Sequence, residues 1–183
     1  MDNKTKRSKV KNTVTGKRIN NRIFVDMDGT IAQFVPGGNY KEKDYFLNLL
    51  PNFSMLNAIK ILIGLGYDVY ILSAVEGERA KQEKMQWLES YLSEISPDHV
   101  IFTSCDKDKA EFISDFCHTD VLLDDYSKNL IPWAKKAIGI KCVNGINWNN
   151  GSWYGYSVHI NSDAQFIANT IRGILQIEDE KVA

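Results

Sequence analysis

The sequence has few cysteines, no long hydrophobic run and no histidine cluster. Its three cysteines are odd in number and include no CxxC pair, which argues against a disulfide scaffold and for reduced thiols in a cytoplasmic protein. No apolar stretch reaches the roughly 18 residues that a membrane span requires. The basic first residues are not followed by the apolar segment of a secretory signal. We therefore expect a cytoplasmic protein with no membrane partner.

Charge is unevenly distributed along the chain. The formal net charge of the 183 residues is −1, yet residues 1–20 carry seven Lys and Arg side chains against Asp2 alone. This stretch is polar and lacks periodicity, which predicts a disordered basic arm. Such an arm could bind nucleic acid, but a solvated leader is the simpler interpretation. The acidic remainder argues against a nucleic-acid groove within the fold.

Short apolar runs alternate with amphipathic segments from residue 21 onward. Strands are predicted at residues 22–25, 68–72, 99–103, 121–123 and 138–143, and helices at 53–65, 78–92, 127–137 and 162–176, with a short helix within 106–116. This alternation predicts parallel β-α-β units. The expected fold is α/β, a three-layer doubly wound (Rossmann-like) parallel sheet.

The connection between the first predicted strand and the first predicted helix is long and irregular. Residues 31–52 contain a Pro-Gly-Gly turn signal and four aromatic side chains, Phe34 among them. We interpret this stretch as a small cap inserted after the first strand. The core would then consist of residues 21–30 and 53–183.

Polar side chains follow three of the predicted strands at the point where each ends. Asp26 and Asp28 follow the first strand, Ser73 the second, and Asp124 and Asp125 the fourth. The carboxyl ends of parallel strands form one edge of the sheet, where such folds bind ligands. Four carboxylates gathered there would repel one another unless a cation compensated. All-oxygen ligands suit Mg²⁺.

Each of these motifs alone has a structural explanation. Asp and Gly favour turns, so the segment from Asp26 to Gly29 could be a plain strand exit. The Asp124-Asp125 pair could cap the next helix, and a Ser after a strand is commonly a cap. Their occurrence together, in this order and at these strand ends, favours a functional site.

The strand-end residues resemble the motifs of the haloacid dehalogenase-like (HAD) phosphatases. Ile-Phe-Val-Asp26-Met-Asp28-Gly-Thr resembles the first motif, and Tyr-Ile-Leu-Ser73-Ala the second. Val-Leu-Leu-Asp124-Asp125 resembles the fourth.

The third motif of this superfamily is a lysine ahead of the last of these strands. Lys109 is the best match, Lys107 is its competitor, and Lys81 fits less well because it precedes the third strand. The resemblance covers about residues 22–145.

Finer detail resembles the 5'(3')-deoxyribonucleotidase-like branch of the superfamily. The segments that carry this resemblance are Leu-Ser-Ala with the downstream Lys84-Met-Gln-Trp87-Leu helix, and Asn144-Gly-Ile-Asn147. The Gly29-Thr pair is typical of the superfamily at large.

The resemblance implies a Mg²⁺-dependent phosphomonoester hydrolase. Asp26 would attack phosphorus and form an aspartyl-phosphate, and Asp28 would serve as general acid and then as general base. The Asp26 carboxylate, the Asp28 backbone carbonyl and the Asp124-Asp125 pair would hold the metal. Which member of the pair ligates directly is left open at this point.

The resemblance also implies how substrate is bound. Ser73 and Ala74 would contact the phosphoryl group, and Lys109 would offset its charge. Phe34 lies six residues after Asp28, where the deoxyribonucleotidases place an aromatic that stacks on the base; packing within the cap is the alternative.

The expected substrate is a small phosphomonoester, first of all a nucleoside monophosphate. The alternatives are a sugar phosphate or other small phosphomonoester, a nucleic-acid end-processing phosphatase that uses the basic arm, and a catalytically silent interaction module. Nucleic acid is not the expected partner. Homo-oligomerisation and the preferred base are left open.

Overall fold

Six parallel strands form a single sheet in the computed structural model, which describes residues 21–147 and 153–182. The strands are β1 (Arg22–Val25), β2 (Asp68–Ala74), β3 (Val100–Thr103), β4 (Val121–Asp124), β5 (Ile138–Val143) and β6 (Tyr156–His159). Their order across the sheet is β3-β2-β1-β4-β5-β6. The chain therefore starts in the middle of the sheet and winds outward to each side in turn, which confirms the predicted doubly wound topology.

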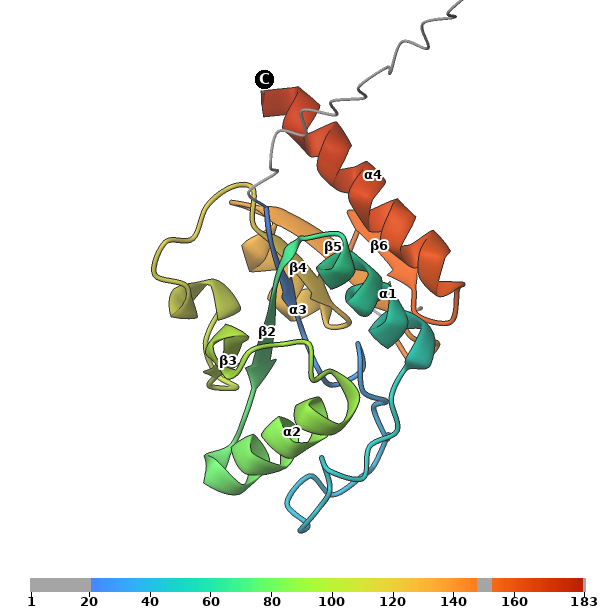
Figure 1. The fold of residues 1–183 in the computed structure, drawn as a ribbon. Coiled ribbons are helices and arrows are strands. Elements are labelled where there is room, and N and C mark those ends of the chain that lie inside the picture. Colours follow the sequence, from blue (N-terminus) through green and yellow to red (C-terminus); the bar gives the residue numbers. More distant parts are fainter. Residues whose placement is uncertain (1–20, 148–152, 183) are drawn as a thin grey trace, which may run out of the picture.

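Helices cover both faces of this sheet (Figure 1). The helices are α1 (Phe53–Gly64), α2 (Gly77–Tyr91), α3 (Ser127–Trp133) and α4 (Ala164–Val182), with the 3₁₀ turns η1 (Pro97–His99) and η2 (Lys109–Phe112). Alternate residues of β1 point to opposite faces, as the period of a strand requires. Ile23 and Val25 join the core beneath α1 and α4, whereas Phe24 packs with Leu130 and Trp133 of α3. The predicted three layers are present.

The structure departs from the predicted elements at a few places. Strand β6 was not predicted, because Val158 is its one fully buried residue and the apolar pattern is correspondingly weak. Helix α3 ends at Trp133, one residue after the proline that it contains. The short helix expected within 106–116 is the single turn η2. The basic arm and Trp148 lie outside the described residues.

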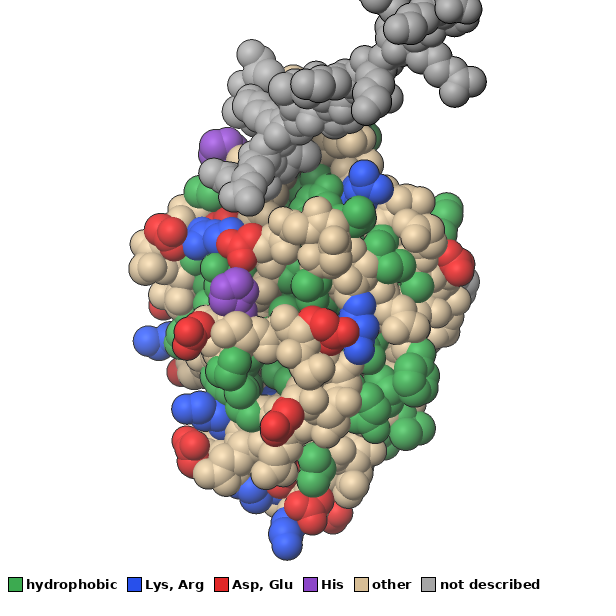
Figure 2. Space-filling view, viewed as in Figure 1, with side chains coloured by type: hydrophobic (Ala, Val, Ile, Leu, Met, Phe, Trp, Pro, Cys, Tyr) green, Lys and Arg blue, Asp and Glu red, His purple; other side chains and the backbone are tan. Residues whose placement is uncertain are grey.

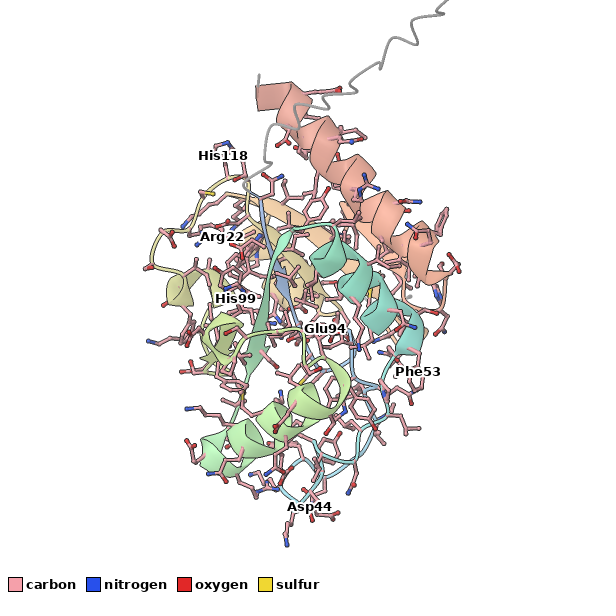
Figure 3. The ribbon with its side chains drawn as sticks, in the orientation of Figure 1. Arg22, Asp44, Phe53, Glu94, His99 and His118 are labelled. Carbon is pink, nitrogen blue, oxygen red and sulfur yellow. The ribbon has the colours of Figure 1, made fainter. Side chains whose placement is uncertain are left out.

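The amino end of β1 is held by an ion-pair cluster. Arg22 contacts Asp115 at 2.6 Å and the fully buried Asp120 at 2.7 Å. Figure 3 shows Arg22 and His118 near one end of the molecule and Asp44 at the other. The amino end of β1 is therefore fixed in position, and the carboxyl end of β1 lies at the opposite edge of the sheet.

Residues 31–52 pass below the carboxyl edge of the sheet and contain no helix or strand (Figure 1). They are fastened to α2 instead. The Glu83 carboxylate accepts hydrogen bonds from the backbone N–H groups of Asp44 at 2.9 Å and Phe46 at 3.0 Å. The indole N–H of Trp87 donates to the carbonyl of Leu49 at 2.7 Å. One helix thus positions this irregular segment over the strand ends.

Charged side chains of both signs are scattered over the face seen in Figure 2. Described Lys and Arg side chains there are interspersed with Asp and Glu, so no basic stripe forms on this face. Among the helices that the structure describes, none is long and apolar enough to cross a membrane.

Candidate active site

The turn after β1 brings two aspartates to the carboxyl edge. The backbone N–H of Asp26 donates to the carbonyl of Leu123 in β4 at 2.8 Å. The backbone that carries the Asp26 side chain is therefore fixed by the sheet. Gly29 then adopts φ +79°, and a Cβ there would lie 2.4 Å from Oδ2 of Asp125. Glycine is required at this position by both conformation and space.

Lys109 bridges two of the strand-end aspartates. Its ammonium lies 2.6 Å from Oδ1 of Asp26 and 2.7 Å from Oδ2 of Asp124, and the side chain is almost fully buried. Burial alone would lower the pKa of Lys109, but the carboxylates of Asp124 and Asp26 outweigh that effect and raise it. Its competitor Lys107 is exposed. Of these two lysines, Lys109 is the one that the structure places against the strand-end aspartates.

Three carboxylates gather beside this lysine. Oxygens of Asp26, Asp124 and Asp125 all lie within 4.8 Å of one another. Burial, with the neighbouring Asp26 anion, raises the pKa of Asp124 to about 6. Burial and the Asp26 and Asp124 anions together raise the pKa of Asp125 to about 8. Carboxylate oxygens gathered this closely are the ligands that a hard cation prefers, so this donor set fits such an ion.

The two members of the Asp124-Asp125 pair have different surroundings. Oδ1 of Asp124 accepts from the backbone N–H of Tyr126 at 2.7 Å, and Oδ2 accepts from Lys109 and from the Asn129 amide at 2.9 Å. Asp125 lines the cavity described below, and its Oδ2 accepts a hydrogen bond from the amide of Asn144 at 2.9 Å. Asp124 is thus held on both oxygens, whereas Asp125 faces the open side of the site.

Lys84 was not predicted as a site residue, yet it contacts both Asp28 and Ser73. Its ammonium is fully buried, and it contacts Oδ2 of Asp28, Oγ of Ser73 at 3.0 Å and the carbonyl of Ala74 at 2.8 Å. Burial raises the pKa of Asp28 against the opposing effect of Lys84. A sequence signal did exist, since Lys84 shares the buried stripe of α2 with Trp87.

A cavity of about 730 Å³ opens above these residues. Its floor includes Asp26, Asp28, Lys109 and Asp125. Its walls are Phe34, Ala74, Tyr126, Ser127, Lys128, Asn129, Ile131, Lys141, Ile146 and Asn147. All the predicted site residues except the buried Ser73 and Asp124 therefore face one cavity, and those two contact Lys84 and Lys109 directly.

Phe34 also borders a second cavity, of about 480 Å³. That cavity is walled by Tyr40, Tyr45, Phe46 and Leu49, and it shares Asp28 and Ala74 with the first. Phe46 is buried and Tyr45 packs edge-on against it at 5.0 Å, as expected for packing residues. Tyr40 is 46% exposed and Phe34 48% exposed, so neither is a core residue of residues 31–52.

Several solved structures share this fold, and two of them are described as phosphatases. One similar structure is a D,D-heptose 1,7-bisphosphate phosphatase from Burkholderia thailandensis, with TM-score 0.60 and 15% identity over 83% of this chain and 98% of that one. Another is a protein described as a HAD-like phosphatase from Mesorhizobium loti, with TM-score 0.55 and 15% identity over 84% of this chain and 86% of that one.

A third similar structure belongs to a larger assembly. It is a chain of a Pnkp1/Rnl/Hen1 complex, with TM-score 0.53 and 17% identity over 68% of this chain and 46% of that chain. Neither a comparison with protein-family models nor one with curated proteins finds a match. These structural similarities establish the fold of the chain and do not identify a reaction or a substrate.

Proposed function

We propose that the protein is a Mg²⁺-dependent phosphomonoester hydrolase that forms an aspartyl-phosphate on Asp26, and that its substrates are nucleoside monophosphates. The observation that carries the proposal is the position of the Asp26 carboxylate at the floor of the cavity, paired with Lys109 and within 4.8 Å of Asp124 and Asp125. This arrangement combines a nucleophile, a cation that offsets phosphoryl charge, and a metal-ligand set.

The reaction divides into two displacements. An oxygen of Asp26 forms a bond to phosphorus while the ester oxygen leaves, and Asp28 gives that oxygen its proton. Water then attacks the aspartyl-phosphate, Asp28 takes the proton, and inorganic phosphate is released with the Asp26 carboxylate restored. Lys109 stays between Asp26 and Asp124 throughout and offsets the charge on the phosphoryl oxygens.

The surroundings of the carboxylates support one choice of metal ligands. Asp26, the carbonyl of Asp28 and Asp125 would hold the ion, because Asp125 faces the cavity while both oxygens of Asp124 are already bonded. Asp124 would orient the site through Lys109 and Asn129. When bound, Mg²⁺ supplies Lewis-acid stabilisation of the phosphoryl charge and compensates the carboxylates.

The raised carboxyl pKa values predict how the metal-free protein responds to pH. The pKa of Asp125 is about 8 in the folded protein, against an ordinary value of 3.8 in the unfolded chain. Between these two pH values the native state therefore binds more protons than the unfolded chain. The free energy of unfolding should therefore fall as pH rises from about 5 to about 8. Thermal unfolding in chelator should show a lower Tm at pH 8 than at pH 6.

Magnesium and a variant provide the controls for that experiment. Adding Mg²⁺ at pH 8 should raise Tm, because the ion binds the deprotonated carboxylates. Asp125→Asn should flatten the pH dependence of Tm in chelator and weaken the Mg²⁺ effect. A Tm that rises with pH in the metal-free wild-type protein would contradict the assignment.

The choice of nucleotides rests on Phe34 and on the branch resemblance. A half-exposed aromatic ring that borders both cavities offers a nucleobase a stacking surface beside Asp26, and stacking contributes about 1–3 kcal/mol per base in single-strand binders. Phe34→Ala should therefore lower kcat/KM for a deoxynucleoside monophosphate by roughly five- to 150-fold. It should barely change kcat/KM for p-nitrophenyl phosphate.

A matched aromatic outside the site controls for the substitution itself. Phe53 at the start of α1 is 64% exposed and lines neither cavity (Figure 3). Phe53→Ala should leave both substrates unchanged. Equal losses for both substrates in Phe34→Ala would mean that the ring packs residues 31–52 over the site and that no base stacks on it.

A sugar phosphate is the second candidate substrate. The exposed Lys128 lines the same cavity as Asp26, and a cation there would suit a second anionic group on the substrate. The neighbour from Burkholderia thailandensis is by name a sugar bisphosphate phosphatase. A screen of nucleoside monophosphates against sugar mono- and bisphosphates, with Mg²⁺, decides between the two candidates by kcat/KM.

A further inference from the structure

The Lys84 ammonium is saturated with oxygen partners from two strand ends. It contacts Oδ2 of Asp28 after β1, and Oγ of Ser73 and the carbonyl of Ala74 in β2. These three contacts match the three N–H donors of a lysine. The ring of Phe46 covers the same ammonium at 4.6 Å. With all its donors engaged, Lys84 holds its partners in one arrangement.

This arrangement treats the two carboxyl oxygens of Asp28 differently. Lys84 engages Oδ2, whereas Oδ1 is shielded from solvent and has no hydrogen-bond partner among the described residues. Asp28 also lines the cavity over Asp26. Through Oδ2, Lys84 therefore fixes the orientation of a carboxyl group that borders this cavity.

The same helix turn fixes the segment above the cavity. Glu83 accepts the backbone N–H groups of Asp44 and Phe46, and Arg79 on the preceding turn contacts Glu83 at 3.0 Å. Consecutive residues of α2 thus hold residues 31–52 on one side and Asp28 on the other. Glu83 has no contact with Asp28 in the described structure, which makes it a matched neighbour for comparison.

We infer that Lys84 is a positioning residue, which fixes the orientation of the Asp28 carboxyl group relative to the leaving oxygen of a substrate in the cavity. The inference rests on the proposed function, since it takes Asp28 as the proton donor in phosphomonoester cleavage. Lys84 itself touches no reacting atom. Its effect is on the direction in which Asp28 delivers the proton.

Leaving groups of different basicity separate this role from a general structural one. The alkoxide leaving group of a nucleoside 5'-monophosphate needs a proton as it departs, whereas p-nitrophenolate leaves without one. The ratio kcat/KM covers the steps up to aspartyl-phosphate formation. General acid catalysis contributes typically 10²–10⁴-fold. Lys84→Met should therefore lower kcat/KM for the nucleotide by about 100-fold or more, and for p-nitrophenyl phosphate by less than about 10-fold.

Three further variants sharpen the comparison. Lys84→Gln retains an N–H donor for Asp28 and should lose less than Lys84→Met with the nucleotide. Asp28→Asn should show the same dependence on leaving group, at least as strongly. Glu83→Gln weakens the anchoring of residues 31–52 alone and should lower kcat/KM for both esters by the same factor.

The outcomes are distinguishable. Equal losses for the two esters in Lys84→Met overturn the inference, and so does failure of both Lys84 variants to fold by circular dichroism, because the lysine would then be a requirement of the fold. Hydrolysis of neither ester by the wild-type protein with Mg²⁺ would overturn the proposed function instead. A loss confined to the alkyl ester in Lys84→Met supports the positioning role.

Discussion

Replacing Asp26 by asparagine is expected to reduce phosphomonoester turnover to background while leaving the fold intact. An amide cannot form the acyl-phosphate, so the covalent step is lost. The fold should survive because asparagine retains an acceptor for Lys109, and Lys109 keeps its contact with Asp124. Steady-state turnover, burst kinetics and beryllofluoride trapping should all fail in Asp26→Asn, with circular dichroism unchanged.

A second Asp→Asn substitution controls for the loss of one negative charge. Asp98 is exposed and lies in η1, outside the cavity. Asp98→Asn should turn over substrate at the wild-type rate. Turnover by Asp26→Asn within 10-fold of the wild-type rate would rule out covalent catalysis through this residue.

Removing divalent cations is expected to have an effect of similar size. Chelator should abolish turnover and Mg²⁺ should restore it, because the buried carboxylates repel both one another and the substrate phosphate without the ion. Asp125→Ala removes a direct ligand and should raise the Mg²⁺ concentration for half-maximal activity by more than 100-fold. Asp124→Ala removes an orienting group, for which losses of about 10–100-fold are typical.

The ranking of the two variants is the sharper part of this prediction. A larger Mg²⁺ requirement in Asp124→Ala than in Asp125→Ala would reverse the ligand assignment. If both variants kept the wild-type Mg²⁺ dependence, the Asp124-Asp125 pair would be a helix cap and not a metal site. Asp98→Ala, which changes an exposed aspartate, should keep the wild-type Mg²⁺ requirement and serves as the control.

Much of the sheet and its polar edge could be predicted from the sequence. Strands β1, β2 and β4 are largely buried and appear as continuous apolar runs, so their ends were marked by the first polar residues, Asp26, Ser73 and Asp124. Parallel strands bring such ends together without any knowledge of strand order. Strand β6 escaped prediction because only one of its residues is fully buried.

The remaining site features depend on long-range packing. Lys84 is a cation on the buried stripe of an amphipathic helix, and a helical pattern alone does not identify the oxygens that accept its hydrogen bonds. The neighbouring Glu83 is explained only by the backbone N–H groups of residues 31–52. That segment has no periodicity, so neither its course nor the two cavities beside Phe34 could be predicted.

The central place of β1 has a consequence for how the protein acquires its site during synthesis. Val25 pairs with Leu123 across β1 and β4, although nearly a hundred residues separate them in the chain. Until β4 has left the ribosome, Asp26 has neither Asp124 nor Asp125 beside it. Pairings at such sequence separation form slowly, and chains emerge at about 5–20 residues per second. The nascent chain therefore spends seconds with its β1 edge uncovered, and the proposed nucleophile meets the other proposed metal ligands only in this late step.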